Sequence, residues 1–140
     1  MQSILDELKV VYEQDHQPKI QTAKDVSQQL IDIKDASKEI FVAFYLNVKN
    51  QVIAREIISI GILDMALIHP RETFRSAIIH NAHAIIIAHN HPGGNPEPST
   101  NDKDVTNLIK QAGELLGIKL LDHVIVSNNE YKSLKEMQLL

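Results

Sequence analysis

Two histidines and an aspartate carry the clearest chemical signal in the sequence. The run over residues 84–88 is apolar and short enough to be a buried strand, and it leads into His89 and, two residues on, His91. Residues two apart on an extended chain point to the same side, so both imidazoles can converge on one point. A loop rich in glycine and proline then leads to Asp102. Two imidazoles and a carboxylate, with a fourth position left for water, are typical of catalytic zinc.

The same aspartate also has a purely structural explanation. Ser99 precedes Asp102 by three residues, and this spacing is typical of a helix N-terminus capped by a serine and an acid in the first turn. A carboxylate has lone pairs for both tasks, so capping and metal binding are compatible. For His89 and His91 the alternative is a pair of ordinary surface or core histidines.

Periodic patterns predict the elements that position these residues. The predicted elements are helices over residues 22–34, 70–81, 105–116 and 131–139 and strands over 39–46, 52–60, 84–88 and 118–126. Gly117 stands where the C-terminal cap of the third helix belongs. The segment over residues 4–12 fits a helix or an extended chain equally well. This order of elements predicts an α/β protein with a mixed β-sheet flanked by helices.

The composition is that of an ordinary globular protein. The chain has 140 residues, 44% of them hydrophobic and 23% charged, with no cysteine and a formal net charge of −4. Lysine and arginine are scattered rather than clustered, which gives a sequence-independent DNA-binding face no support. The sequence has no apolar run long enough to cross a bilayer and no signal-peptide pattern, so we expect a cytoplasmic protein without membrane association.

The spacing of the candidate ligands is similar to a known motif. His89, His91, Ser99 and Asp102 match in type and spacing the JAMM (MPN-plus) motif of JAB-domain metallohydrolases. The resemblance implies a zinc-dependent hydrolase of amide or isopeptide bonds, in which both histidines and the aspartate hold one divalent metal ion, with Zn²⁺ expected. It assigns Ser99 to stabilising the oxyanion of the tetrahedral intermediate.

Two further roles fall on residues outside this cluster. The JAMM motif places a glutamate at the start of the hairpin's first strand, so the resemblance implies Glu39 as general base and acid. Glu56 and Glu72 stay open as alternatives, because one sequence does not decide which carboxylate folds over the metal. His123 lies within a later apolar strand, where it either orients a metal ligand from behind or is an ordinary core histidine.

The residues around the motif narrow the resemblance further. The sequence over residues 88–92, 69–72 and 121–123 is similar to the JAB domain of RadC proteins, a family described as DNA repair proteins. This resemblance implies an N-terminal extension over residues 1–20 and a RadC-like JAB/MPN domain over 21–140, with a three-layer, cytidine-deaminase-like fold. It also implies a short form, because the chain has no room for the helix-hairpin-helix region of longer RadC proteins.

Three functions remain in competition at this stage. The first is the zinc-dependent hydrolase, acting on a protein or peptide substrate. The second is a metal-dependent nuclease or DNA-processing factor, prompted by the RadC resemblance and the literal His-Asn-His, against which stands the absence of a basic face. The third is a non-catalytic, zinc-stabilised binding module. DNA association rests on family analogy alone, and a homo-oligomer is left open.

Overall fold

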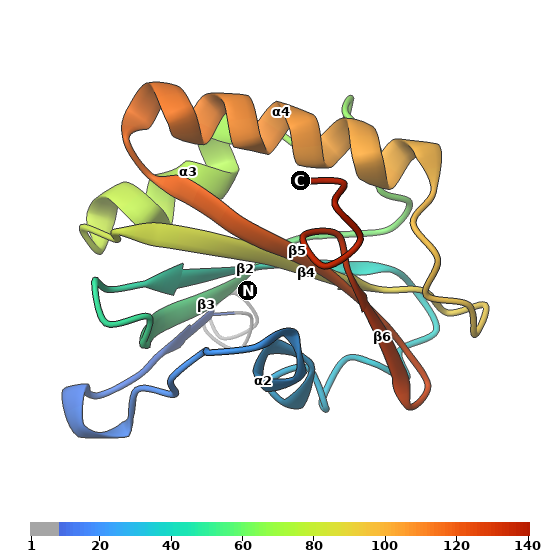
Figure 1. The fold of residues 1–140 in the computed structure, drawn as a ribbon, viewed down its shortest axis with the longest axis horizontal. Coiled ribbons are helices and arrows are strands. Elements are labelled where there is room, and N and C mark those ends of the chain that lie inside the picture. The colour runs from blue at the N-terminus through green and yellow to red at the C-terminus, as the bar shows by residue number, and fades with distance from the viewer. Residues whose placement is uncertain (1–8) are drawn as a thin grey trace, which may run out of the picture.

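A mixed six-stranded sheet forms the centre of the molecule, which the computed structural model describes over residues 9–140 (Figure 1). The strands are β1 (Lys9–Val11), β2 (Ile40–Leu46), β3 (Val52–Ile60), β4 (Ala84–Asn90), β5 (Lys119–Ser127) and β6 (Glu130–Ser133). The helices are α2 (Ala23–Gln28), α3 (Pro70–Ile79) and α4 (Thr100–Leu116), with a 3-10 turn at Gln14–His16. The predicted α/β class, a mixed sheet flanked by helices, is confirmed.

The sheet has the order β1-β3-β2-β4-β5-β6. Every described pair of neighbouring strands is antiparallel except β4 and β5, which run parallel. Helices α3 and α4 cover one face of the sheet and α2 covers the other (Figure 1). Strand β4 is buried along its whole length, as expected for an interior strand with helices on both sides. Within the described residues, no helix is long and apolar enough to cross a membrane.

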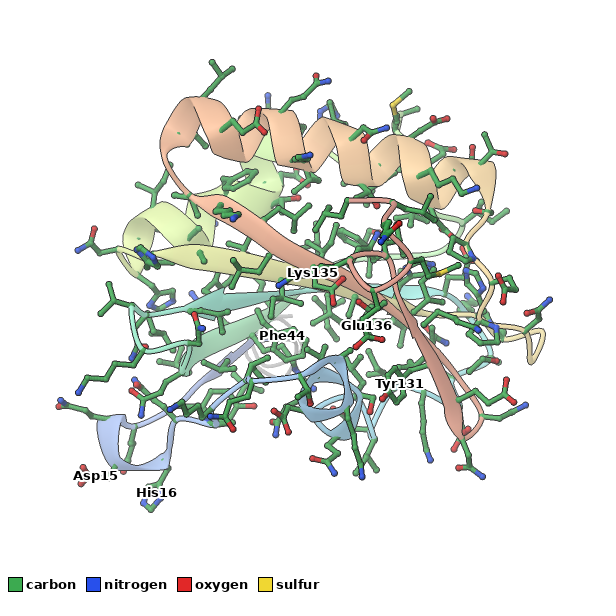
Figure 2. The ribbon with its side chains drawn as sticks, viewed as in Figure 1. Asp15, His16, Phe44, Tyr131, Lys135 and Glu136 are labelled. Carbon is green, nitrogen blue, oxygen red and sulfur yellow. The ribbon has the colours of Figure 1, made fainter. Side chains whose placement is uncertain are left out.

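Each face of the sheet has its own apolar core. The core under α3 and α4 includes Phe41, Phe74 and Ile109, and the core under α2 includes Leu30 and Phe44. The two β2 residues face opposite cores because successive strand residues alternate between the faces of a sheet. In Figure 2, Phe44 lies inside the molecule, whereas the labelled residues of the 3-10 turn project from its edge.

The first helix is shorter than predicted. A helix was expected over residues 22–34, but α2 ends at Gln28 and residues 29–35 continue as turns. These turns still bury Leu30 and Ile33, which are 0% and 4% exposed. The apolar spacing is therefore satisfied without a continuous helix, because successive tight turns also direct residues three apart toward the sheet.

The prediction of a closing helix over residues 131–139 is wrong. Residues 130–133 instead form β6, which pairs antiparallel with the end of β5, and turns follow. Asn128 adopts a positive φ of 53° in the two-residue connection, and asparagine is one of the residues that tolerate this conformation in hairpin turns. Backbone hydrogen bonds to β5 outweigh the weak intrinsic stability of such a short helix.

Most other predicted boundaries are confirmed. The strands predicted over 39–46, 52–60 and 118–126 agree with β2, β3 and β5 to within one residue at each end. Gly117 ends α4 in the left-handed conformation, with a φ of 72°, which a glycine adopts without steric cost. In the ambiguous segment over residues 4–12, residues 9–11 form β1, and residues 4–8 lie outside the described part of the chain.

Candidate metal centre

His89, His91 and Asp102 meet at the end of β4. One ligand atom from each of the three lies within 4.8 Å of the others. The Nε2 atoms of His89 and His91 are 2.9 Å apart. The carboxylate of Asp102 places Oδ1 3.1 Å from Nε2 of His89 and Oδ2 3.0 Å from Nε2 of His91. The structure therefore brings together the three residues that the sequence singled out as metal ligands.

The parallel pairing of β4 and β5 holds the two histidines on one side. His89 is the second-last residue of β4, and the backbone N–H of His91 donates to the carbonyl of Val126, 2.9 Å away, which continues the pairing past the strand end. The hydroxyl of Ser127 donates to the carbonyl of His91 at 2.7 Å. Because the chain stays extended through His91, residues two apart point the same way.

The N-terminus of α4 supplies the carboxylate. The hydroxyl of Ser99 accepts from the backbone N–H of Asp102 at 3.1 Å, and Oδ2 of Asp102 accepts from the backbone N–H of Ser99 at 2.7 Å. This is a complete capping box. The same carboxylate faces both imidazoles, so capping and convergence on the histidines occur together. Ser99 itself is exposed beside the cluster, and its cap uses only a lone pair of the hydroxyl oxygen.

The cluster holds Asp102 in its charged form. Burial opposes ionisation of this side chain, which is 2% exposed, but the rings of His89 and His91, which donate to it when they are protonated, and the Ser99 amide keep the pKa of Asp102 well below its usual range. In return, the hydrogen bond to Asp102 raises the pKa of His91 above its ordinary value, and the charge of Glu39 contributes a smaller part. The centre thus favours positive charge between the two histidines and the carboxylate.

The donor set fits a divalent transition metal. Nδ1 of His91 lies 2.8 Å from the backbone carbonyl of Asn95, and a carbonyl oxygen only accepts, so Nδ1 carries the proton. In the neutral imidazole, Nε2 then presents a lone pair toward Asp102. Two imidazole nitrogens and one carboxylate suit Zn²⁺ among the common biological metals. His89, His91 and Asp102 are accordingly the residues that would hold the ion.

His123 lies directly behind His89. Its Nε2 is 2.8 Å from Nδ1 of His89, and its Nδ1 is 2.6 Å from the hydroxyl oxygen of Thr106. Complete burial, with a smaller effect of the nearby His89, lowers the pKa of His123 well below its ordinary value. Thr106 was missed in the sequence. Its spacing of four residues from Asp102 places both on one face of α4 and was the available signal.

Glu39 lies near His91, at the same end of the neighbouring strand. Phe41 pairs with His89 in the antiparallel register of β2 and β4, and Glu39 and His91 each stand two residues beyond this pair, just outside the strands. The carboxylate of Glu39 accepts from the backbone N–H of Leu63 at 3.0 Å, so one oxygen is held by the loop after β3. The half-buried side chain keeps its other oxygen for a further partner.

Glu56, on β3, and Glu72, on α3, face each other away from the candidate metal centre. The hydroxyl of Ser76 donates to the carboxylate of Glu56. Both glutamates line a cavity of about 370 Å³, together with Arg71 and Arg75 of α3. Of the three glutamates considered from the sequence, Glu39 is the one whose charge reaches His91.

Asn90, between the two histidines, is a second residue that sequence reasoning missed. Its side-chain oxygen accepts from the backbone N–H of Ile40 at 2.6 Å, and its amide nitrogen donates to the carbonyls of Lys38 and Ala36 at 3.0 and 3.3 Å. Asn90 therefore fastens the segment that carries Glu39 to β4. The signal was its place in an apolar strand, because a buried amide needs hydrogen-bond partners.

The fold and this cluster define an α/β domain with a candidate metal centre at the end of its central parallel strand pair. A family model described as the RadC-like JAB domain matches residues 20–139. The chain therefore belongs to the RadC-like JAB domain family, as its motif indicated.

Curated relatives agree with this assignment. The chain is 50% identical over 130 residues to a UPF0758 protein of Chlorobium chlorochromatii. The aligned residues make up 92% of this chain and 59% of the relative. It is 48% identical over 123 residues to a UPF0758 protein of Chlorobaculum tepidum, covering 87% and 55%, respectively. A UPF0758 protein of Geobacillus thermodenitrificans is 49% identical over 105 residues, covering 75% and 46%. The chain spans about half the length of the relatives it matches.

Proposed function

We propose that this protein is a zinc-dependent hydrolase of the JAMM class that cleaves an amide or isopeptide bond in a protein or peptide. The observation that carries the proposal is the convergence of His89, His91 and Asp102, whose ligand atoms all lie within 4.8 Å of one another. Membership of the JAB family supports the same chemistry. Glu39, whose charge reaches His91, adds a carboxylate that can exchange protons with a water molecule at the site.

The roles of the individual residues follow from their positions. Zinc held by the two histidines and Asp102 would supply a Lewis acid and lower the pKa of a water molecule to about 7. Glu39 would accept a proton from the attacking water molecule through the carboxylate oxygen that the Leu63 amide leaves free, and would pass it to the amine as the C–N bond of the substrate breaks. Ser99 directs its hydroxyl proton to the oxyanion that develops on the substrate carbonyl.

The surface beside Glu39 favours a peptide over a nucleic acid. The carbonyl of Glu39 accepts from the backbone N–H of Gly61, so the loop after β3 adjoins this residue. This loop exposes the apolar side chains of Ile62, Met65 and Leu67, which are 74%, 51% and 57% exposed. Apolar side chains offer contacts to a peptide but no charge to pair with phosphate. This observation weighs against the nuclease alternative.

The first test is the metal content of the purified protein by elemental analysis. We expect close to one zinc ion per chain in the wild type and its loss in His89→Ala, His91→Ala and Asp102→Ala, because each change removes a ligand. His83→Ala is the matched control, since His83 is exposed at the start of β4 and should keep the metal. A wild-type protein that neither contains zinc nor takes it up on addition would overturn the proposal.

The second test separates catalysis from metal binding. In a screen of peptide and isopeptide substrates, we expect Glu39→Gln to lower turnover by at least 100-fold while its zinc content stays at the wild-type level, because the amide cannot take the proton. Glu56→Gln and Glu72→Gln are the controls and should hydrolyse the same substrates at nearly the wild-type rate. Full activity of Glu39→Gln would remove Glu39 from the mechanism.

A further inference from the structure

We infer that Thr106 and His123 form a directional hydrogen-bond chain that fixes the tautomer of His89 and keeps its Nε2 lone pair directed at the candidate metal centre. Both are positioning residues, since they act through His89. The inference rests on the proposed function only in that a metal ion uses this lone pair. The hydrogen-bond chain itself is a property of the metal-free protein.

The direction of the chain follows from its last member. The hydroxyl of Thr106 lies 2.7 Å from the backbone carbonyl of Asp102, which only accepts, so the hydroxyl proton is used there. The Thr106 oxygen, 2.6 Å from Nδ1 of His123, must then accept a proton from that nitrogen. A neutral His123 with its proton on Nδ1 has a lone pair on Nε2. That lone pair accepts from Nδ1 of His89 at 2.8 Å, which leaves Nε2 of a neutral His89 with a lone pair.

Burial makes this order of protons compulsory. Thr106, His123 and His89 are each 0% exposed, so water does not replace a missing partner, and an unpaired buried donor costs about 1–3 kcal/mol. The chain starts at one candidate ligand and ends on the backbone of another, so β4, β5 and α4 all share in orienting the centre.

The chain explains how His89 remains ready to bind a metal. His91 has its tautomer set by the carbonyl of Asn95, 2.8 Å away at the protein surface. His89 has no such carbonyl partner, because its Nδ1 faces another histidine, which can donate or accept. Without the Thr106 oxygen, His123 is free to carry its proton on Nε2. His89 would then have to accept at Nδ1 and carry its own proton on Nε2, where the metal binds.

The tautomer of His123 tests the chain without metal. Long-range proton–nitrogen NMR on metal-free protein labelled with ¹⁵N-histidine, at mildly alkaline pH, distinguishes a proton on Nδ1 from one on Nε2. We expect His123 to carry its proton on Nδ1 in the wild type and in Thr106→Ser, which keeps the hydroxyl. In Thr106→Val we expect this signature to be lost. A His123 proton on Nε2 in the wild type would overturn the inference.

Zinc affinity, measured by competition with a chromophoric chelator, tests the purpose of the chain. We expect Thr106→Val to weaken zinc binding about 10- to 100-fold, as for other residues that orient a metal ligand, and Thr106→Ser to restore it to within about threefold. Thr73→Val is the matched control. Thr73 is also 0% exposed and its hydroxyl also donates to the carbonyl four residues earlier, but its hydrogen bonds go to His69 and Tyr45, not to a candidate ligand or to His123.

The outcomes distinguish the two proposals. Equal zinc affinity in Thr106→Val, Thr106→Ser and Thr73→Val would overturn the inference while leaving the proposed hydrolase intact. A wild-type protein that binds no zinc would overturn the proposed function and the purpose of the chain, whatever the tautomer of His123. If Thr106→Val does not fold, the NMR measurement on the wild type still decides whether the chain exists.

Discussion

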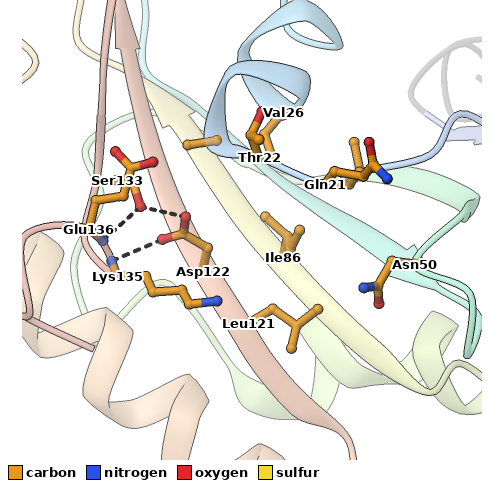
Figure 3. A pocket seen from close by; sticks show the side chains of 12 residues that line it. Gln21, Thr22, Val26, Asn50, Ile86, Leu121, Asp122, Ser133, Lys135 and Glu136 are labelled. Carbon is orange, nitrogen blue, oxygen red and sulfur yellow. Dashed lines mark hydrogen bonds between the residues drawn. The ribbon is translucent and has the colours of Figure 1, made fainter.

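At the scale of single residues, Asp122 is a buried carboxylate on the opposite face of the sheet from the candidate metal centre. It lines a cavity of about 360 Å³ next to α2, where Figure 3 shows it bonded to Ser133 at the end of β6 and to Lys135 just after it. Its oxygens accept from the backbone N–H groups of His123 and Lys135, at 2.7 and 3.1 Å, and from the hydroxyl of Ser133 at 2.6 Å. Burial raises the pKa of Asp122 despite these hydrogen bonds.

We expect Asp122→Asn to raise the free energy of unfolding at pH 7. Because the folded-state pKa is raised, the folded protein holds this proton more tightly than the unfolded chain, so wild-type stability falls as pH rises through and above the unfolded pKa of about 3.9. Each tenfold change in the ionisation constant corresponds to about 1.4 kcal/mol. The asparagine carbonyl can still accept from both amides, and its N–H₂ can donate to Ser133, without the charge.

Urea denaturation at pH 3, 5 and 7 measures this effect. The gain of Asp122→Asn over the wild type should shrink toward zero at pH 3, where the wild-type carboxyl is protonated in both states. Asp122→Ala, which loses the hydrogen bonds as well, should be less stable than Asp122→Asn at every pH. A wild type that is as stable as Asp122→Asn at pH 7 would contradict the expected cost of the buried charge.

At the scale of elements, β4 organises both sides of the site. His89 and Asn90 are the last two residues of β4 and face opposite sides of the sheet. His89 faces the candidate metal centre, and Asn90 fastens the segment that leads into β2. Because neighbouring residues of β4 face opposite sides, one strand both presents a candidate ligand and holds the segment that carries Glu39. Pairing of β2 with both β3 and β4 keeps this connection in register.

We expect Asn90→Leu to destabilise the protein and to lower turnover without removing the metal. The leucine leaves one N–H group and two carbonyls of residues 36–40 without partners, at about 1–3 kcal/mol for each group that stays dry. Loss of the clamp frees the segment that carries Glu39, whereas His89 and His91 keep their own partners. Urea denaturation, metal content and the peptide screen give the three readouts.

Asn47→Leu is the matched control for the Asn90 variant. Asn47 also clamps β2, at its other end, by accepting from the backbone N–H groups of Lys49 and Gln51 at 2.9 and 3.0 Å. The Asn47→Leu variant should lose stability but keep the wild-type turnover. If both variants lose turnover equally, the effect of Asn90 is one of general stability and the positioning of Glu39 through it is refuted.

At the scale of the whole molecule, the candidate centre links the sheet to α4. Two candidate ligands come from the end of β4 and the third from the first turn of α4, with the glycine- and proline-rich loop over residues 92–99 between them. When the His91 ring is neutral, the lone pair of its Nε2 faces the carboxylate of Asp102 across 3.0 Å. A cation between these groups relieves their repulsion and joins the two elements.

We expect removal of zinc to lower the melting temperature. A metal that binds only the folded state stabilises it by mass action, by about 4 kcal/mol when free metal exceeds the dissociation constant 1,000-fold. Thermal unfolding with zinc and with a chelator measures the shift, and Asp102→Ala should show almost none. An unchanged melting temperature of the wild type, with metal loss confirmed by elemental analysis, would contradict a structural contribution of the metal.

The sequence by itself determined the parts of this protein that depend on short-range patterns. The apolar run over residues 84–88 marked the buried strand, the spacing of Ser99 and Asp102 marked the helix cap, and Gly117 marked the end of α4. Each of these signals acts within a few residues, through strand alternation, capping and the left-handed conformation of glycine. The family resemblance could likewise be found from the motif and its neighbouring residues.

Only the tertiary structure decided the relations between distant residues. Residues 130–133 form a strand because the edge of β5 is there to pair with them, which a local helical pattern does not reveal. Glu39 stayed one of three candidate glutamates in the sequence, and only the packing of the strands showed that its charge reaches His91. Thr106 and His123 acquired a role only when α4 and β5 brought them behind His89. Such contacts join residues far apart in the chain, so their geometry depends on how the layers pack.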